Sequence, residues 1–301
     1  MRVVSVLPSA TEIVYALGHG FELVGRSSEC DFPPQVRALP EVMRPRVWDM
    51  DQPSQAIDDR VHKARSRNES LYDLDIELLS TLRPDLLLTQ NLCGVCSVTE
   101  EEVTTACARA GVAPRVVSLA PTDLAEVWDS IETVGKALGD PDAGLVLARR
   151  SREATRGRSP TGRSVAVVEW LDPPILAGLW TPDLIEAAGG VALGPKRGEP
   201  GRRTSWSELE RNPPDLLVLS PCSFSVVRTN RELSANSGLL QDVRSVRPSL
   251  GCFVADEAYF SRPGPRLAEG EGLLRRLLDR EPPNGPMPVE SLLSDPSEGN
   301  A

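Results

Sequence analysis

The sequence predicts an α/β fold of two related lobes with parallel sheets. Short, uniformly apolar segments alternate along the 301-residue chain with segments of helical periodicity. A strand without polar positions is typical of a parallel sheet that helices cover on both faces. The chain is also long enough for two domains of ordinary size. The strands that we expect span residues 3–7, 86–88, 116–119, 165–168, 216–219 and 252–255.

A repeated pattern supports the division into two lobes. Residues 77–89 and 208–220 both predict a short helix, a Pro-Asp turn and a buried strand. Residues 11–18 and 182–189 both predict a helix that ends at a glycine able to adopt the left-handed conformation. The C-terminal stretch is rich in Pro, Ser and acidic residues, as is typical of a mobile tail. We therefore expect an N-terminal lobe over 1–121, connecting helices over 122–160, a C-terminal lobe over 161–281 and a disordered tail over 282–301.

Composition excludes several classes of function. The chain has 43 acidic and 33 basic residues, a net charge of −10, which disfavours nucleic acid as a partner. It has two histidines, His19 and His62, which leaves little material for multi-histidine metal sites or His-centred catalytic triads. No apolar run has the length of a membrane span, and no nucleotide-binding glycine motif is present. The opening residues predict a strand and no signal peptide, so we expect a cytoplasmic protein with reduced cysteines.

The segment after the first strand predicts a helix start. Ser9 and Glu12 have the spacing of a capping box, in which Ser9 accepts a backbone hydrogen bond and Glu12 reaches back. In the functional alternative, this helix start binds a polar or anionic part of a ligand, with Ser9 and Thr11 as contacts. Thr99 with Glu102 and Ser205 with Glu208 have the same spacing and are expected to be caps alone.

The motif Cys93-Gly-Val-Cys96 follows a predicted strand and leaves three alternatives. The thiols either pack within the protein, or form a redox pair, or bind a metal ion such as zinc or iron. In the metal alternative, Cys30 and a carboxylate from Glu12, Glu29 or Asp31 join Cys93 and Cys96. Cys107 and Cys252 fall in a helix and a strand and are expected in the core.

Aromatic and polar side chains in loops supply the candidate ligand contacts. Trp48, Trp170, Trp180 and Trp206 all lie in or beside predicted loops, where a large ring either contacts a flat ligand or plugs the edge of a lobe. Arg262 is able to pair with a carboxylate or phosphate. Further candidates are the polar residues Ser9, Thr11 and Gln90 at predicted strand ends.

Five segments also match the motifs of a known family. They are residues 4–12 (VSVLPSATE), 29–33 (ECDFP), 90–96 (QNLCGVC), 169–174 (EWLDPP) and 261–266 (SRPGPR). On these segments the chain resembles the cobalamin-binding type of periplasmic binding protein, in the helical-backbone class III that also holds metal and siderophore receptors. The resemblance extends over about residues 1–280 and is strongest to a branch without an export signal. It implies a clamshell of two Rossmann-like lobes joined by a backbone helix, with a ligand held between them.

Two departures from the family shape the functional expectation. Relatives of this branch commonly have a histidine just before the Glu-Cys-Asp loop, where this chain has Ser28. The DxHxxG motif, by which corrinoid-dependent enzymes ligate cobalt, is absent. We therefore expect any corrinoid to be held by aromatic and polar residues, without a histidine on cobalt. Without an export signal, a transporter permease is not an expected partner.

The sequence thus predicts a cytosolic protein that holds a corrinoid (cobalamin)-like or other bulky flat ligand in an inter-lobe cleft. The alternative is a metal- or thiol-dependent enzyme on the same scaffold. Its catalytic candidates are Glu12, Glu29, Cys93, Cys96 and Glu169, and its metal-ligand candidates are Cys30, Asp31, Cys93 and Cys96.

Overall fold

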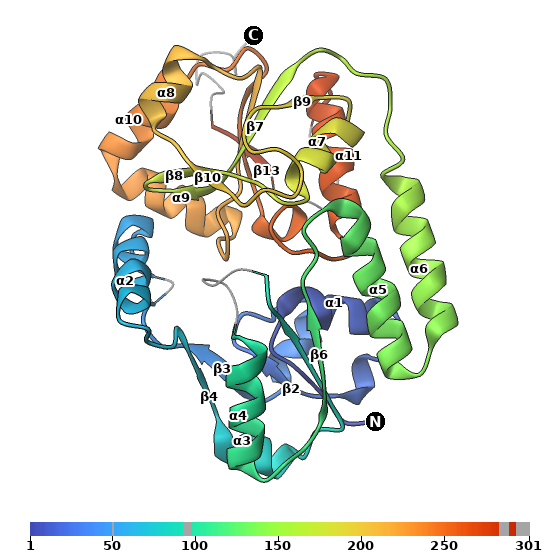
Figure 1. The fold of residues 1–301 in the computed structure, drawn as a ribbon. Helices are drawn as coiled ribbons and strands as arrows, with labels where there is room; N and C mark the ends of the chain where they lie inside the picture. Colours follow the sequence, from blue (N-terminus) through green and yellow to red (C-terminus); the bar gives the residue numbers. More distant parts are fainter. Residues whose placement is uncertain (50, 93–97, 283–288, 293–301) are drawn as a thin grey trace. The chain divides into compact units, whose positions relative to one another are not determined.

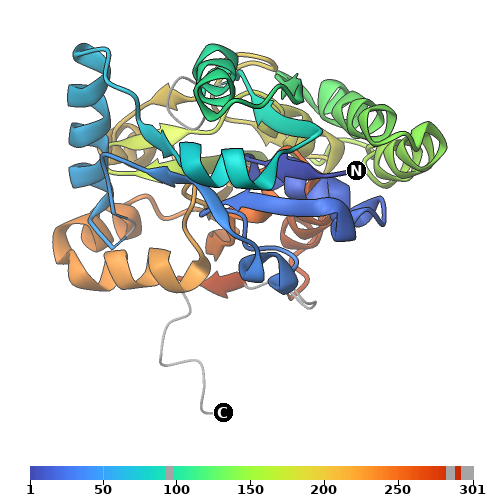
Figure 2. The ribbon, with the colours of Figure 1, turned by 90° about the horizontal axis from the view of Figure 1, so that it is seen from below.

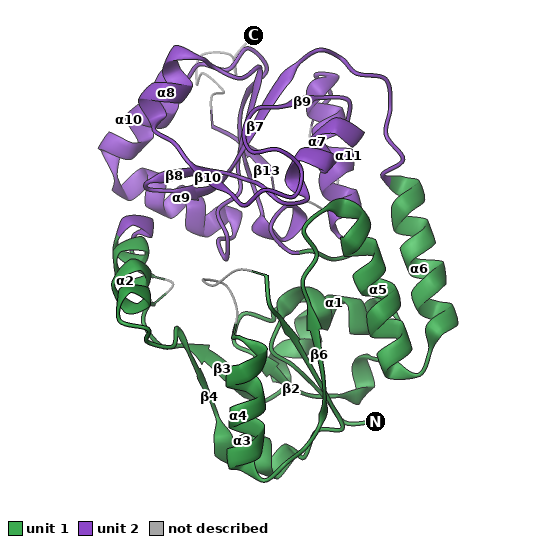
Figure 3. Ribbon diagram, in the orientation of Figure 1, with its two compact units in different colours: residues 1–52, 56–154, 263–265 green, residues 53–55, 155–262, 266–301 purple. Residues whose placement is uncertain are grey.

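The protein is built from two compact α/β units (Figure 3). The computed structural model describes residues 1–49, 51–92, 98–282 and 289–292. The first unit comprises Met1–Gln52, Ala56–Ala154 and Pro263–Pro265, and the second comprises Pro53–Gln55, Thr155–Arg262 and Arg266–Ala301. The helices that the sequence sets apart as a connection therefore cluster with the first unit.

The first unit alternates strands and helices in the order expected of a doubly wound fold (Figure 1). Its elements are β1 (Val3–Ser5), α1 (Pro8–Ala16), η1 (Gly20–Glu22), β2 (Leu23–Ser27), η2 (Pro34–Ala38), β3 (Glu41–Pro45), α2 (Ser54–Ser66), β4 (Tyr72–Leu74), α3 (Ile76–Leu82), β5 (Leu86–Gln90), α4 (Glu100–Ala110), β6 (Arg115–Leu119), α5 (Leu124–Leu138) and α6 (Pro141–Ala154).

Its sheet has the strand order β4-β3-β2-β1-β5-β6, in which all pairs but β3–β4 are parallel. Strands β1 and β5 lie at the centre with Val3 opposite Leu86, and both strands are buried along their whole length. The chain starts at β1, builds outward through β2 and β3 to β4 and then returns to place β5 on the other side of β1. The point where the strand order reverses therefore lies between β1 and β5.

Helices α5 and α6 pack side by side at the end of the first unit, as both Figure 1 and Figure 2 show. Their close approach depends on two glycines. A Cβ atom on Gly135 would lie 2.8 Å from the Cα atom of Gly144 and 2.9 Å from the carbonyl oxygen of Asp140. No side chain fits between these backbones, so a glycine is required at this crossing.

The second unit repeats the α/β plan with more antiparallel strands at its edges. Its elements are β7 (Ser164–Leu171), β8 (Pro174–Leu176), α7 (Thr181–Ala187), β9 (Val191–Ala192), β10 (Arg202–Arg203), α8 (Trp206–Arg211), β11 (Leu216–Leu219), α9 (Val226–Ala235), α10 (Ser237–Ser245), β12 (Gly251–Ala255), η3 (Glu257–Tyr259), α11 (Leu267–Leu278) and β13 (Val289–Ser291).

The second sheet has the strand order β10-β8-β7-β11-β12-β13. Strands β7, β11 and β12 are parallel, with Val165 opposite Leu216, whereas β8, β10 and β13 pair antiparallel. The short strand β9 pairs with the beginning of β7, on the edge that β8 occupies further along. The strand order reverses between β7 and β11, as it does between β1 and β5 in the first unit.

The sequence repeat forms the same helix–turn–strand motif in both units. Helix α3 with strand β5, and helix α8 with strand β11, are the two copies, and each joins its helix to its strand through a Pro-Asp turn. In the first copy, Asp85 accepts a hydrogen bond from the backbone N–H of Arg2 (2.7 Å), which leads into β1. In the second, Asp215 accepts from the backbone N–H of Ser164 (2.8 Å), which opens β7. The aspartate therefore fixes the start of the central neighbouring strand in both sheets.

Asp215 also makes the stability of the second unit depend on pH. The hydroxyl of Ser249 and the backbone N–H of Ser164 donate to its carboxylate, and these bonds lower the pKa of Asp215. Because the folded pKa lies below the unfolded one, the stabilisation is complete above the unfolded pKa, about 3.9, and is lost as the pH falls through the folded pKa.

We therefore expect Asp215→Asn to lower the free energy of unfolding by about 1–2 kcal/mol at pH 7 and by less at pH 3. Urea unfolding followed by tryptophan fluorescence at both pH values measures the difference. The control is Asp242→Asn, which changes an exposed carboxylate on α10 and is expected to have little effect at either pH. A stability loss at Asp215 that is the same at both pH values would contradict the expectation.

The structure confirms several sequence predictions and corrects others. All six predicted strands are present, with β11 at the predicted bounds, and Gly18 and Gly189 have left-handed φ values of 84° and 85°. Thr99 and Ser205 cap α4 and α8. The predicted Ser9 cap is wrong, because Pro8 already occupies the first helical position and Leu7 is the N-cap of α1.

The C-terminal stretch differs from the predicted disordered tail. Val289–Ser291 forms β13, which pairs antiparallel with β12, Val254 lying opposite Glu290. An edge strand of three residues contributes few apolar positions, so the composition of the stretch does not reveal it. The remaining predicted tail residues, 283–288 and 293–301, lie outside the described residues.

Candidate functional site

Ligands of doubly wound sheets bind beyond the carboxyl ends of the strands, where the strand order reverses. In the first unit this region follows β1 and β5, and it includes the start of α1 and Gln90 at the end of β5. In the second unit it follows β7 and β11, and it includes Glu169, Trp170 and the loop that ends at Phe224. The candidate residues are described unit by unit.

A buried cluster of two hydroxyls and a thiol occupies the carboxyl end of β1. Thr11 Oγ1 lies 2.9 Å from Ser5 Oγ and 3.1 Å from Cys30 Sγ, and Ser5 Oγ donates to the carbonyl oxygen of Leu7 (3.0 Å). All three polar side chains are buried. The single hydroxyl proton of Thr11 goes either to Ser5 or to Cys30, so a deprotonated Cys30 would find a donor already in place.

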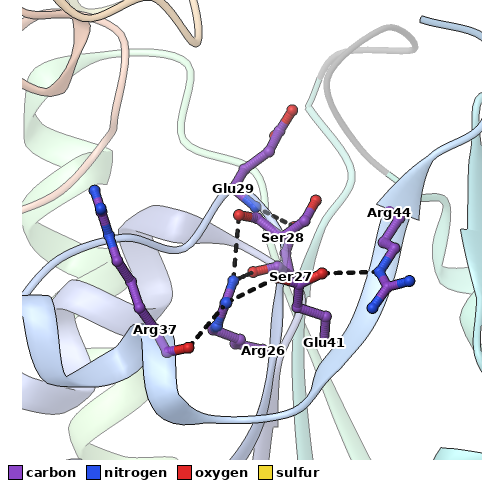
Figure 4. Close-up of polar contacts among 7 residues, drawn as sticks. All are labelled: Arg26, Ser27, Ser28, Glu29, Arg37, Glu41 and Arg44. Atoms are coloured by element: carbon purple, nitrogen blue, oxygen red, sulfur yellow. Dashed lines mark hydrogen bonds and ion pairs between the residues drawn. The ribbon is translucent and has the colours of Figure 1, made fainter. Parts of the chain in front are cut away.

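The loop that carries Cys30 is anchored by the buried guanidinium of Arg26 (Figure 4). Arg26 donates to the carbonyl oxygens of Ser27 (2.9 Å), Ser28 (3.2 Å) and Arg37 (3.2 Å). It also forms an ion pair with Glu41 on β3 at 2.9 Å. One side chain thus ties both ends of the segment 28–37 to strands β2 and β3, which holds residues 29–31 in place.

Two carboxylates flank Cys30 in this loop. The backbone N–H of Glu29 donates to Ser27 Oγ (3.2 Å), and the Glu29 side chain extends away from the Arg26 guanidinium in Figure 4. Asp31 lies 3.7 Å from Arg37 in an exposed ion pair. A third predicted carboxylate, Glu12, is buried within α1. Cys30 therefore faces the protein interior while Asp31 faces solvent, so the structure does not bring these two predicted metal ligands together.

Ser9 and Trp48 complete the described candidates of the first unit. Ser9 is buried in the first turn of α1, where its Cβ atom faces Gly264. The half-buried ring of Trp48 packs edge-on against Tyr72 of β4, with ring centroids 5.2 Å apart.

Cys93 and Cys96 lie outside the described residues. Within residues 1–49, 51–92, 98–282 and 289–292, no group of three His, Cys, Asp or Glu side chains has an arrangement that could hold a metal ion. The metal and redox alternatives for the Cys-Gly-Val-Cys motif stay predictions. Cys107 and Cys252 are buried, as predicted, and burial raises the pKa of Cys252 to about 12, which keeps this thiol protonated.

A stack of three side chains, Trp170, Phe224 and Arg228, occupies the carboxyl ends of β7 and β11 in the second unit. The Trp170 and Phe224 rings have centroids 5.4 Å apart at a tilt of 49°, and the Arg228 guanidinium lies 4.2 Å from the centre of the Phe224 ring. Phe224 is completely buried, whereas Trp170 is half-buried. The stack therefore presents part of an indole ring, with an aromatic and a cationic side chain behind it.

The charged groups around this stack are arranged in close pairs. Arg228 pairs with Glu232 one helical turn away at 3.0 Å, and both side chains are largely buried. Arg262, a predicted ligand contact, pairs with Glu257 at 2.5 Å. The carboxylate of Glu169 lies against the backbone of Gly201, where a Cβ atom would come within 1.9 Å of it.

The other two predicted tryptophans are structural. Trp180 is buried at the start of α7, and its indole N–H donates to the carbonyl oxygen of Phe260 (2.7 Å). Trp206 is buried in the core cluster that also contains Leu217 and Val254. Both tryptophans are buried, which favours the packing alternative. Each lies at the start of a helix, and such a position is hard to distinguish from a loop in the sequence alone.

Sequence reasoning missed Arg26, Phe224 and Arg228 as site-forming residues. Each is a common residue type without a motif around it, and its contacts come from segments far away in the sequence. Their position in the sequence could have pointed to them. Phe224 and Arg228 follow the second copy of the repeat, just as the Cys93 motif follows the first.

Three solved structures share this fold over nearly the whole chain. A periplasmic heme-binding protein from Pseudomonas aeruginosa is 21% identical, with a TM-score of 0.67 over 96% of this chain and 97% of that one. A periplasmic heme-binding protein from Roseiflexus is 21% identical, with a TM-score of 0.65 over 93% and 98%. The periplasmic vitamin B12-binding protein of Vibrio cholerae is 20% identical, with a TM-score of 0.61 over 92% and 96%. The chain has the class III periplasmic-binding-protein fold.

Comparison with curated protein sequences adds one local match. The vitamin B12-binding protein of Photorhabdus laumondii is 48% identical over 42 residues, which are 14% of this chain and 15% of that protein. No family model matches the chain. In the described part of this class III chain, no helix is long and apolar enough to cross a membrane.

Proposed function

We propose that this chain is a ligand-binding protein for a corrinoid such as cobalamin. The observation that carries the proposal is the 42-residue segment that is 48% identical to a vitamin B12-binding protein. The fold supports it, because proteins of this fold bind vitamin B12 in one case and heme in two others. All of these ligands are large and flat, and a flat ring is well matched to an aromatic side chain at a strand end.

Each unit contributes contacts of a different chemistry to this proposal. The first offers hydroxyls, an amide and carboxylates at the ends of β1, β2 and β5, with Thr11, Gln90 and Glu29 as candidates. The second offers the partly exposed ring of Trp170. None of these candidates is a histidine, and the proposal is that the ring face and the polar edge of the ligand are held without a histidine on cobalt.

Titration of the purified chain tests the proposed function. Isothermal calorimetry with cyanocobalamin, dicyanocobinamide and hemin, each at micromolar concentration, is expected to show stoichiometric binding of the two corrinoids. Cobinamide lacks the lower nucleotide arm, so its binding would locate recognition on the corrin ring. Absence of heat and of any change in the corrinoid absorption spectrum would exclude the proposal.

The cytoplasmic location expected from the opening residues stays a prediction, which fractionation of cells that produce the chain would check. Metal analysis of protein purified without chelators would check the metal-dependent alternative. Stoichiometric zinc or iron that is lost on Cys93→Ser would favour that alternative.

A further inference from the structure

The indole N–H of Trp170 is a buried donor to which no described residue offers an acceptor. Buried polar groups in folded proteins nearly always have a partner, and a donor without one is destabilising. The N–H of Trp180, by comparison, is bonded to Phe260. Trp170 also lies at the strand-order reversal of its sheet, where ligands of this fold class bind. Its missing partner is therefore at the place where a ligand would supply one.

The half-buried ring gives a ligand access to this donor. Part of Trp170 is exposed, so a flat ligand can lie against it, and a rotation of the side chain then turns the N–H toward the ligand edge. Such a rotation breaks no hydrogen bond between the indole and the described residues. The same movement of Trp180 would leave the Phe260 carbonyl without its donor. Trp206 also has an N–H without a described partner, but its ring is buried in the core, so Trp170 is the partly exposed tryptophan of this unit that can take a ligand as its partner.

The charges around Trp170 decide which acceptor suits the site. The guanidinium of Arg228 is paired with Glu232, and that of Arg262 is paired with Glu257. A carboxylate on a ligand would therefore have to compete with Glu232 and Glu257 for these two guanidinium groups, which is unfavourable. An uncharged carbonyl carries no such penalty.

We infer that the Trp170 N–H donates a hydrogen bond to an uncharged carbonyl oxygen at the edge of the ligand, and that this contact selects amide-edged rings over carboxylate-edged ones. This inference rests on the proposed function and adds a specificity to it. The corrin ring carries amide side chains, whereas heme carries two propionates. The site therefore favours a corrinoid over heme for a reason that lies in this chain's own residues.

The test compares two tryptophans that both have a buried N–H without a described partner. Trp170→Phe retains an aromatic ring and removes the donor, and Trp206→Phe does the same in the core of the unit. Cyanocobalamin is expected to bind Trp170→Phe about tenfold or more weakly than the wild type, and to bind Trp206→Phe with unchanged affinity. In the wild type, hemin and a cyanocobalamin monocarboxylic acid, in which one amide is hydrolysed, are expected to bind more weakly than cyanocobalamin.

A second measurement uses the unmodified chain. With isotope-labelled tryptophan, the indole N–H resonance of Trp170 is expected to shift when cyanocobalamin is added, while that of Trp206 stays in place. Unchanged affinity of Trp170→Phe, or an unmoved Trp170 resonance in a chain that binds cyanocobalamin, overturns the inference and leaves the proposed function standing. A wild-type chain that binds no corrinoid removes both.

Discussion

Gly135→Ala is expected to lower the free energy of unfolding by about 2 kcal/mol, against the intrinsic preference of a helix for alanine. That preference favours alanine by about 1 kcal/mol in a helix interior. At Gly135, however, the new methyl group would lie 2.8 Å from the Gly144 Cα atom and 2.9 Å from the Asp140 carbonyl, and both are backbone atoms. Overpacking of this kind costs about 1–3 kcal/mol or more, because α5 and α6 have to separate.

Gly272→Ala on α11 is the matched control for this prediction. A Cβ atom there meets only the far end of the Arg276 side chain, at 3.9 Å, so helix preference is expected to dominate and stabilise the protein by up to about 1 kcal/mol. Urea unfolding of both variants should therefore give changes of opposite sign. A stabilising effect at Gly135 would show that the helices do not approach as closely as described.

The second large effect is expected for Arg26→Met, with a loss of about 3–5 kcal/mol. The substitution removes the donor from three carbonyl oxygens and the partner from the Glu41 carboxylate, and the breaking of a buried charged network is costly. Arg26→Lys should recover only a small part, because an ammonium group cannot reach four acceptors in the fork geometry of guanidinium. Chemical unfolding, with limited proteolysis of the segment 28–37, measures both consequences.

Arg44→Met separates the effect of the buried carbonyl contacts of Arg26 from that of the ion pair with Glu41, since Arg44 pairs with the same glutamate. Arg44 lies 2.8 Å from Glu41, but 67% of its side chain is exposed, whereas the Arg26 side chain is 7% exposed. An exposed ion pair is worth about 0–1 kcal/mol, so the variant should be close to wild type. Equal losses at Arg26 and Arg44 would mean that the ion pair with Glu41, and not the carbonyl network, supplies the stability.

The strands on either side of each strand-order reversal, β1 and β5 or β7 and β11, were predictable from the sequence, whereas interior strands such as β2 and β8 and most edge strands were not. Strand β11 is entirely apolar and β5 begins with three leucines, and the Pro-Asp turn before each one marks its start. Strand β10, in contrast, consists of Arg202 and Arg203, whose side chains are exposed. Such a strand forms because it pairs with a neighbouring strand, and the local sequence does not show which segment that neighbour is.

The candidate site was predictable in its location and less so in its members. Parallel strands place their carboxyl ends along one edge, so Thr11, Cys30 and Trp170 were expected at those edges and lie there. Local pattern could not show that Cys30 turns inward to Thr11, that Trp180 bonds to Phe260, or that Arg26 bonds to the carbonyl oxygen of Arg37, eleven residues further along. These contacts depend on side-chain direction, which the fold sets only after the strands have paired.

The two aspartates of the repeat have a consequence for how such a protein can diversify. Asp85 and Asp215 fix strand alignment at the amino ends of β5 and β11, at the margin of each sheet remote from the loops after these strands. Mutations in those loops therefore leave strand alignment intact. Two copies of one scaffold are free to acquire unlike surfaces, one with thiol and hydroxyl groups and the other with indole and guanidinium groups, without loss of foldability.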